Sequence, residues 1–272
     1  DNTVDTKGRR RRHEGKLMQT PIILYDNRLT DGTLVATDTE TGYDVLNLID
    51  LRPYTFWKAA SHGTKYITVD CGAAKSADCL AIIGHNLYTA GATVSIESSP
   101  DNSSWTVHLA GFTPTSDKAV LKTFTSASAQ YWRIKIVTAA VAAYMAVALL
   151  GVKIQFEYPP NTPYVPYAET PAADVERSKN GHILGVATYS PVLRIQPQFS
   201  LVSRTWLDTY FIPFWQNYAR LFKPFFFVWD LDTYPSDVFF TSIDDDMPLE
   251  TPFSVLTYVD TLTLKLRGVK EV

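Results

Sequence analysis

The chain has 272 residues, of which 46% are hydrophobic and 19% charged, and its formal net charge is -3. This composition excludes a largely disordered chain, because there is enough apolar surface to offset chain entropy, and the length predicts two domains. The small negative charge argues against specific nucleic-acid recognition. The longest apolar run, residues 139–151, is shorter than the roughly 20 residues of a membrane helix, so no membrane span is expected.

Residues 1–20 form a basic N-terminal arm. Arg9, Arg10, Arg11 and Arg12 follow one another here, and such a run suits an acidic protein face or phosphate. We regard these arginines as a candidate subunit interface, and a solvated tail is the alternative. No signal-peptide pattern opens the sequence, so export is not expected.

Residues 21–157 are predicted to form a β-sandwich. PIILYDNRL reads as a first strand, and a long irregular segment rich in Thr, Asp and Gly follows it. Six short β-patterned segments come next, separated by turn residues: KYITVDC, CLAIIGHNL, ATVSIESS, WTVHLAGF, QYWRIKIV and YMAVALLGVKIQF. The pattern leaves no room for βαβ crossovers and favours an antiparallel sandwich. Within it, Cys71 and Cys79 are expected to be reduced and buried.

Residues 158–180 are rich in proline, which cannot donate in the centre of a sheet, and they predict a semi-rigid linker. Residues 181–272 predict a C-terminal β-sandwich with one packed helix, which Ser203 caps and Pro213 kinks or breaks. On this helix aromatic residues recur every four positions. The stripe is either core or, for Trp206, Tyr210 and Phe214, a subunit interface.

Motifs for catalysis are missing from the sequence. No histidine pair has the spacing of a helical metal site, CxxC is absent, and so are GxSxG, Walker-type and GxGxxG patterns. We therefore expect no catalytic residue, no cofactor and no enzymatic activity. The acidic groups Asp230 with Asp232 and residues 244–246 leave a glycan-cleaving enzyme as a remote alternative.

Two clusters are candidate binding sites. Asp26, Asn27 and Asp31 offer hard oxygen ligands beside Gly32, as a calcium site requires, although a turn held by side-chain hydrogen bonds is the alternative. Carbohydrate binding needs aromatic faces with polar neighbours on loops. The residues that meet this description, with a core role as the alternative for Trp57, are Arg52, Tyr54, Phe56, Trp57, Lys58 and Tyr88.

Several landmarks occur in one order: YDNRLTDGT, Trp57, YITVDCG, LAIIGHNL, SSPDNSSWT, QYWRIKI and LLGVKI. In this order residues 22–156 resemble the discoidin-like (F5/8C, galactose-binding-like) modules. The run from LYDNRLTDGT to RPYTFWKA also resembles the opening of virion proteins of tailed phages. The strands around KPFFFVWD and TLTLKLRGV are similar to the sandwich with a packed helix of tail-tube and distal-tail ring proteins.

The resemblance implies a structural component of a phage tail tip or baseplate, assembled in the host cytoplasm and located in the virion. Its partners would be copies of itself in a ring, other tail or baseplate proteins, and host-surface glycan. A free carbohydrate-binding lectin is the rival hypothesis from another class. The two differ in that the lectin would be a monomer.

Overall fold

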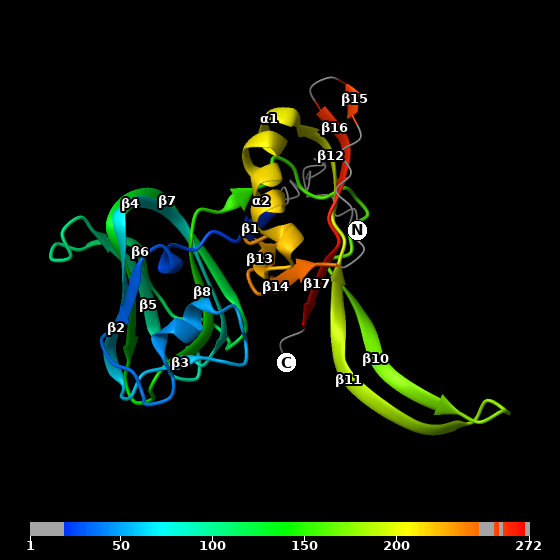
Figure 1. Ribbon diagram of the computed structural model, residues 1–272, viewed down its shortest axis with the longest axis horizontal. Coiled ribbons are helices and arrows are strands. Elements are labelled where there is room, and N and C mark those ends of the chain that lie inside the picture. Colours follow the sequence, from blue (N-terminus) through cyan, green and yellow to red (C-terminus); the bar gives the residue numbers. More distant parts are fainter. Residues whose placement is uncertain (1–18, 245–252, 256–257, 270–272) are drawn as a thin grey trace, which may run out of the picture.

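The computed structural model describes residues 19–244, 253–255 and 258–269. These residues form two units that lie side by side (Figure 1). Strands dominate, and one helical segment runs from Arg204 to Leu221. The prediction of a mainly β chain with one helix is confirmed. Within the described ranges, no helix has the length and apolarity needed to cross a membrane.

In the N-terminal sandwich some strands, such as Val120–Thr138, alternate buried and less buried residues, whereas Tyr144–Gly151 is buried almost throughout. Its strands follow the order β3-β8-β4-β7-β5-β6, with β2 beside β4. Their bounds are β2 (Thr33–Ala36), β3 (Trp57–Lys58), β4 (Gly63–His85), β5 (Thr93–Ser99), β6 (Thr106–Phe112), β7 (Val120–Thr138) and β8 (Tyr144–Gly151). A core that includes Trp57, Trp132 and Leu150 fills the space between its two faces.

Strands β4 and β7 bend together and cross from one layer of the sandwich to the other. They pair along nearly their whole length, with register shifts between Asp70 and Lys75 and between Ala77 and Cys79. Two separate strands, KYITVDC and CLAIIGHNL, were expected where the single strand β4 runs. Gly72, with φ of +69°, marks the bend rather than a chain reversal.

The second unit contains a sheet in the order β10-β11-β17-β14-β13-β1-β9 and a smaller sheet in the order β12-β16-β15. The bounds in the larger sheet are β1 (Ile22–Leu24), β9 (Ile154–Gln155), β10 (Ala168–Arg177), β11 (Ile183–Ile195), β13 (Phe225–Val228), β14 (Val238–Ile243) and β17 (Leu266–Val269). The smaller sheet consists of β12 (Gln198–Ser203), β15 (Phe253–Val255) and β16 (Tyr258–Thr263).

The domain boundaries differ from the order expected along the chain. Strand β1, predicted as the opening strand of the sandwich, pairs with β9 and β13 in the second unit. The N-terminal sandwich is therefore inserted between two neighbouring strands of the second unit. The expected linker at residues 158–180 holds β10, which lies at a sheet edge where its proline at position 171 coincides with a register shift.

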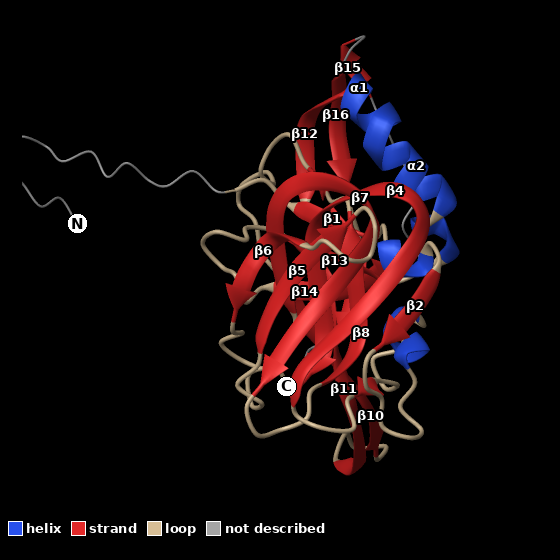
Figure 2. Cartoon of the chain, turned by 90° about the vertical axis from the view of Figure 1, so that its left-hand side faces the viewer, coloured by secondary structure: helices blue, strands red, loops and turns tan. Residues whose placement is uncertain are grey.

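The helical segment covers one side of the second unit (Figure 2). It consists of α1 (Arg204–Trp206), a π-helical turn over Leu207–Phe211, α2 (Ile212–Asn217) and a 3₁₀ turn over Ala219–Leu221. The predicted cap is confirmed, because the Ser203 side chain accepts from the Trp206 N–H. The wide turn ends two residues before Pro213, whose ring would clash with the carbonyl of an ordinary preceding turn.

An apolar interface joins the two units. Strands β1 and β13 are buried on both faces. Ile23 and Phe227 contact the core beneath the helix, whereas Leu24 and Phe226 contact the N-terminal sandwich at strands β4, β7 and β8. Because this contact is continuous and buried, the two units form one body.

Candidate functional site

Loops form one end of the N-terminal sandwich, opposite the bend of β4 and β7. The register places the end of β4 beside the starts of β7 and β8, since Ile82 pairs with Val120 and His85 with Met145. The loops that meet at this end, which we call the loop end, include residues 50–56, 86–92, 113–119 and 139–143. Loops presented on a rigid scaffold are a common place for recognition.

Tyr54 is the most exposed large hydrophobic residue of the loop end, with 77% of its surface accessible. Its turn is rigid because Asp50 accepts hydrogen bonds from the Arg52 N–H at 2.8 Å and from the Thr55 hydroxyl at 2.6 Å. The side chain of Arg52 is exposed beside it. An aromatic ring and a guanidinium are thus presented to solvent on a fixed turn.

Tyr88 lies on the next loop and is 54% exposed. The carboxylate of Asp117 accepts from the backbone N–H groups of Tyr88 at 2.9 Å and Thr89 at 3.1 Å. Although desolvation opposes the shift, these bonds and the Thr89 hydroxyl lower the pKa of Asp117 and keep it charged. Gly84, with φ of +65°, packs closely on β8, because a Cβ there would lie only 2.7 Å from Ala146 Cβ. The Pro53 carbonyl oxygen, in the Tyr54 turn, would lie at an ordinary contact distance of 3.6 Å.

Phe56, Trp57 and Lys58 were predicted to bind glycan but lie differently from Tyr54. Trp57 is fully buried in the sandwich core, so for this residue the core alternative holds. Phe56 stacks on Tyr43 with ring centroids 4.7 Å apart, and the Lys58 ammonium pairs with Glu40 at 2.6 Å. Burial on alternate positions of β3 explains the difference. Arg52, Tyr54 and Tyr88 remain as candidates at the loop end.

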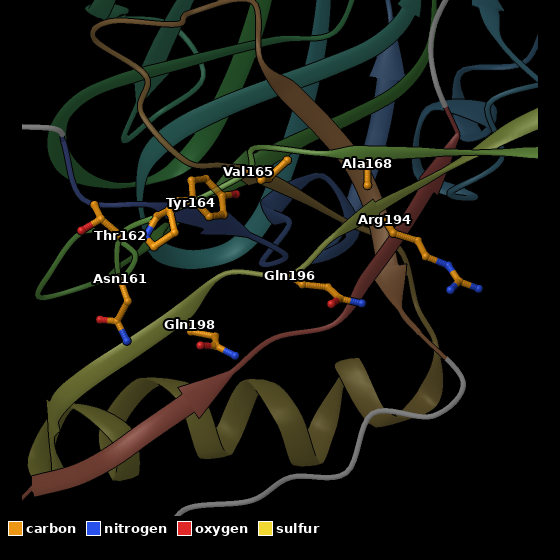
Figure 3. Close-up of a pocket in the computed structure, with 9 residues that line it drawn as sticks. Asn161, Thr162, Tyr164, Val165, Ala168, Arg194, Gln196 and Gln198 are labelled. Atoms are coloured by element: carbon orange, nitrogen blue, oxygen red, sulfur yellow. The ribbon is translucent and has the colours of Figure 1, made fainter.

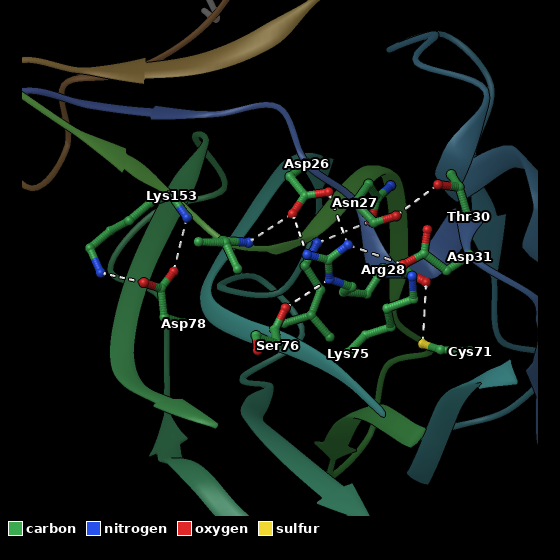
Figure 4. Close-up of polar contacts among 12 residues, drawn as sticks. Asp26, Asn27, Arg28, Thr30, Asp31, Cys71, Lys75, Ser76, Asp78 and Lys153 are labelled. Carbon is green, nitrogen blue, oxygen red and sulfur yellow. Dashed lines mark hydrogen bonds and ion pairs between the residues drawn. The ribbon is translucent and has the colours of Figure 1, made fainter. Parts of the chain in front are cut away.

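Arg28 occupies the space that a calcium ion would need between Asp26 and Asp31 (Figure 4). Its guanidinium bonds to Asp26 at 2.5 Å and to Asp31 at 3.1 Å, and its Nε donates to the Ser76 carbonyl at 2.7 Å. Burial raises the pKa of Asp26, and the Arg28 charge counteracts this shift. Both carboxylates are therefore already paired with one internal cation, Arg28.

Asn27 serves as a structural link rather than as a free oxygen ligand. Its side-chain oxygen accepts from the Leu29 N–H at 3.1 Å and the Leu150 N–H at 3.2 Å, and its amide donates to the Ala148 carbonyl. These bonds tie the turn to β8, as in the alternative of a hydrogen-bonded turn. Across the described part of the chain, no group of three His, Cys, Asp or Glu side chains is placed to hold a metal.

The predicted interface residues divide between core and surface. Trp206 and Phe214 lie on the buried face of the helical segment, whereas Tyr210 is 48% exposed. Arg9 to Arg12 lie outside the described residues. The helical stripe is therefore mainly core, and Tyr210 alone of the three is presented to solvent.

The acidic residues considered for glycan cleavage have structural surroundings. Asp230 is 1% exposed, and its Oδ1 accepts from the Thr233 N–H at 3.0 Å. Asp244 is also buried, while Asp232 is exposed. A buried turn carboxylate such as Asp230 cannot reach a polysaccharide from this position. Asp245 and Asp246 lie outside the described residues.

A stack of one arginine and two aromatic rings on the outer sheet face was not predicted from the sequence. The Arg133 guanidinium lies 3.7 Å from the ring centroid of Trp105 and 4.2 Å from that of Tyr66. Beside it, Asp70 and Tyr131 line a hollow of about 540 Å³. The sequence could have indicated this feature, because residues 131, 133 and 135 alternate along β7 and therefore lie on one face of the sheet.

The N-terminal sandwich, which carries the loop end, is similar to known proteins. Residues 33–149 match the family model described as F5/8 type C domain. The discoidin-like fold predicted for this region is thereby confirmed. No curated protein matches the chain.

Solved structures similar to the F5/8 type C unit include three carbohydrate-binding modules. Chitosan-binding module 1 of a chitosanase/glucanase from Paenibacillus sp. IK-5 is 19% identical with a TM-score of 0.40, covering 46% of this chain and 98% of that one. The CBM32 of AlyQ, in complex with 4,5-unsaturated mannuronic acid, is 23% identical with a TM-score of 0.38 (47% and 96%). A CBM32 from Clostridium perfringens, in complex with GalNAc-beta-1,3-galactose, is 14% identical with a TM-score of 0.41 (47% and 99%).

Proposed function

We propose that this protein is a non-catalytic glycan-recognition protein that binds carbohydrate at the loop end of its F5/8 type C unit. The observation that carries the proposal is the exposure of Tyr54 on a turn fixed by Asp50, with Arg52 beside it. Tyr88 adds a second exposed ring at the same end. The family match supports the same conclusion through its fold.

The chemistry of these groups suits a sugar. A tyrosine ring offers an apolar face to the C–H groups of a pyranose, and its hydroxyl remains free to bond. Among the described residues, the Arg52 side chain has no hydrogen bond or ion pair, so its donors are available for sugar hydroxyls or a carboxylate. Both loops are held by internal hydrogen bonds, which limits the entropy lost on binding.

A glycan microarray with the full chain, followed by calorimetry on the best ligand, tests this proposal. Y54A should weaken binding about two- to tenfold, which corresponds to one lost stacking contact, and R52Q should weaken it as well. Y210A is the matched control, because Tyr210 is an exposed tyrosine of the second unit. Unchanged affinity of both Y54A and R52Q, with native circular dichroism, would overturn the assignment.

A second candidate function is assembly into a tail tip or baseplate of a tailed phage, in a ring with copies of the same chain and other tail proteins. Its support is the part of the β10–β11 hairpin that projects from the rest of the molecule (Figure 1). On this hairpin, 40–69% of the surface is exposed at five apolar residues: Val175, Ile183, Leu184, Val186 and Tyr189. An isolated hairpin is marginally stable in water, and exposed apolar groups of this kind favour a partner.

Light scattering and electron microscopy of the full chain test the assembly function. Closed rings that are lost in the L184S variant would support it. The expected site of such a protein is the virion, so detection in purified particles is a second readout. A monomer at all concentrations, together with absence from virions, would exclude assembly and leave the lectin function.

A further inference from the structure

A groove opens in the second unit where a short strap leaves a neighbouring strand. Residues 161–168 form the strap, and it is bonded to the strand segment 194–198 at both ends. The Asn161 N–H donates to the Gln198 carbonyl at 2.7 Å, and Ala168 pairs with Arg194 in the β10–β11 ladder. Between these points the strap bulges away and encloses a hollow of about 440 Å³.

The sequence of the strap explains why the ladder is interrupted. Pro163 and Pro166 have no backbone N–H, so this stretch cannot continue the pairing that Ala168 begins. Tyr164 packs inward, where its ring lies 5.7 Å from that of Trp229, and its hydroxyl donates to the Pro166 carbonyl at 3.4 Å. The opening is therefore a fixed feature of the strap.

The floor of the groove is a row of polar side chains at every second position. Arg194, Gln196 and Gln198 are exposed, while the alternating Ile195 and Phe199 are buried in the core below the helix. Figure 3 shows the three polar side chains projecting to the same side of the strand segment. Because the alternate residues anchor the backbone, the row is held in place.

The polar groups of this row have hydrogen-bonding capacity left for a ligand. No side-chain hydrogen bond of Gln196 or Gln198 occurs within the described ranges. Arg194 forms a long ion pair with Asp244, its Nε lying 3.9 Å from Oδ2. This distance is beyond a hydrogen bond, so the guanidinium N–H donors stay available to a ligand. Among the residues that the structure describes, no acidic side chain lines the hollow, whose remaining lining residues are Asn161, Thr162, Pro163, Tyr164, Val165 and Ala168.

We propose that this groove is a second carbohydrate site and that it selects an acidic saccharide, one that carries a carboxylate. Carboxamides both donate and accept, as sugar hydroxyls do, so Gln196 and Gln198 match a polyhydroxylated ring. The Arg194 guanidinium matches a carboxylate with paired, charge-assisted bonds. Val165, 66% exposed on the strap, supplies an apolar wall for ring C–H groups. The volume lies within the usual range for small-ligand sites.

An extended acidic peptide is a weaker match to the same groove. A peptide bound beside a strand needs free backbone groups and alternating side-chain pockets. Here Asn161 and Ala168 already use the backbone at both ends of the segment. The free groups are side-chain amides and one cation, and these favour the saccharide.

The test uses the full chain and a uronic-acid trisaccharide, with its methyl ester as the uncharged probe, in calorimetry and saturation-transfer NMR. R194Q should weaken acid binding about tenfold to a hundredfold and leave ester binding unchanged, because only the charged contact is lost. Q196A should weaken both probes. R220Q is the matched control, since Arg220 is exposed on the helical segment and does not line the groove.

Two results would overturn the inference. Acid binding that survives R194Q but is lost in R52Q would place the ligand at the loop end. Tighter binding of an acidic tripeptide than of the trisaccharide, with the same R194Q dependence, would replace the saccharide with a peptide. A failure of this groove leaves the loop-end proposal intact, because R52Q and Y54A report on that site separately.

Discussion

Replacing Phe226 or Phe227 with alanine should separate two functions of one strand. Both residues are fully buried on β13, but they point to opposite layers. Phe226 contacts the N-terminal sandwich and lies 5.0 Å from the Phe240 ring, whereas Phe227 contacts the core below the helix. F226A therefore perturbs the interface between the units, and F227A is its matched control within one unit.

The magnitude follows from complete burial. A fully buried phenylalanine replaced by alanine costs about 3–5 kcal/mol, because apolar transfer energy is lost and a cavity remains. We expect both variants to lose this amount, since neither side chain is accessible to solvent. In F226A the cavity lies at the contact between units, so the units should also unfold separately.

Guanidinium unfolding followed by tryptophan fluorescence, with calorimetry, checks this expectation. F227A should keep the same degree of cooperativity as the parent chain, whereas F226A should show a lower denaturant slope or two transitions. A loss below about 1 kcal/mol in F226A would contradict the buried interface. A single transition with an unchanged slope would contradict coupling through this contact.

Three further results are expected. R28Q should lower the free energy of unfolding by about 1–3 kcal/mol in urea titration, since Asp26 loses its partner, and R28K should not restore it fully. Burial lowers the pKa of His85 below 6.5. The unfolded chain thus protonates first, so stability should fall as the pH drops below about 6.5, and less steeply in H85Q. Burial raises the pKa of Cys71 to about 11 and that of Cys79 further. Ellman's reagent near pH 8 should label them only after denaturation, and rapid labelling of the native chain would contradict this burial.

The sequence predicted the fold where local patterns are strong. Alternating apolar residues predicted many of the strands, and Ser203 correctly predicted where the helix begins. The pairing of β1 with β9 and β13 could not be predicted, because Ile22–Leu24 is a short apolar run that fits any buried strand. Its burial on both faces depends on contacts more than one hundred residues away.

The candidate site could be predicted only as a set of loops. Exposed Tyr54 and buried Trp57 are three residues apart with similar chemistry, and only the position of β3 in the sandwich decides which is free. Arg28 follows Asp26 by two residues, so the sequence already placed a cation near these carboxylates. The ion pairs it makes with Asp26 and Asp31 depend on how the turn folds.

The pairing of β1 with β9 has a consequence for how this chain could be rebuilt. Ile23 lies opposite Ile154, so the N-terminal sandwich leaves and re-enters the second unit at adjacent positions of two paired strands. Guest modules with neighbouring ends can be exchanged at such a position without stretching the host. A tight turn could join these strands directly, provided that Phe226 and Val228, which contact the N-terminal sandwich, received a new cover. The second unit could therefore accept another inserted domain that covers a similar area of its surface.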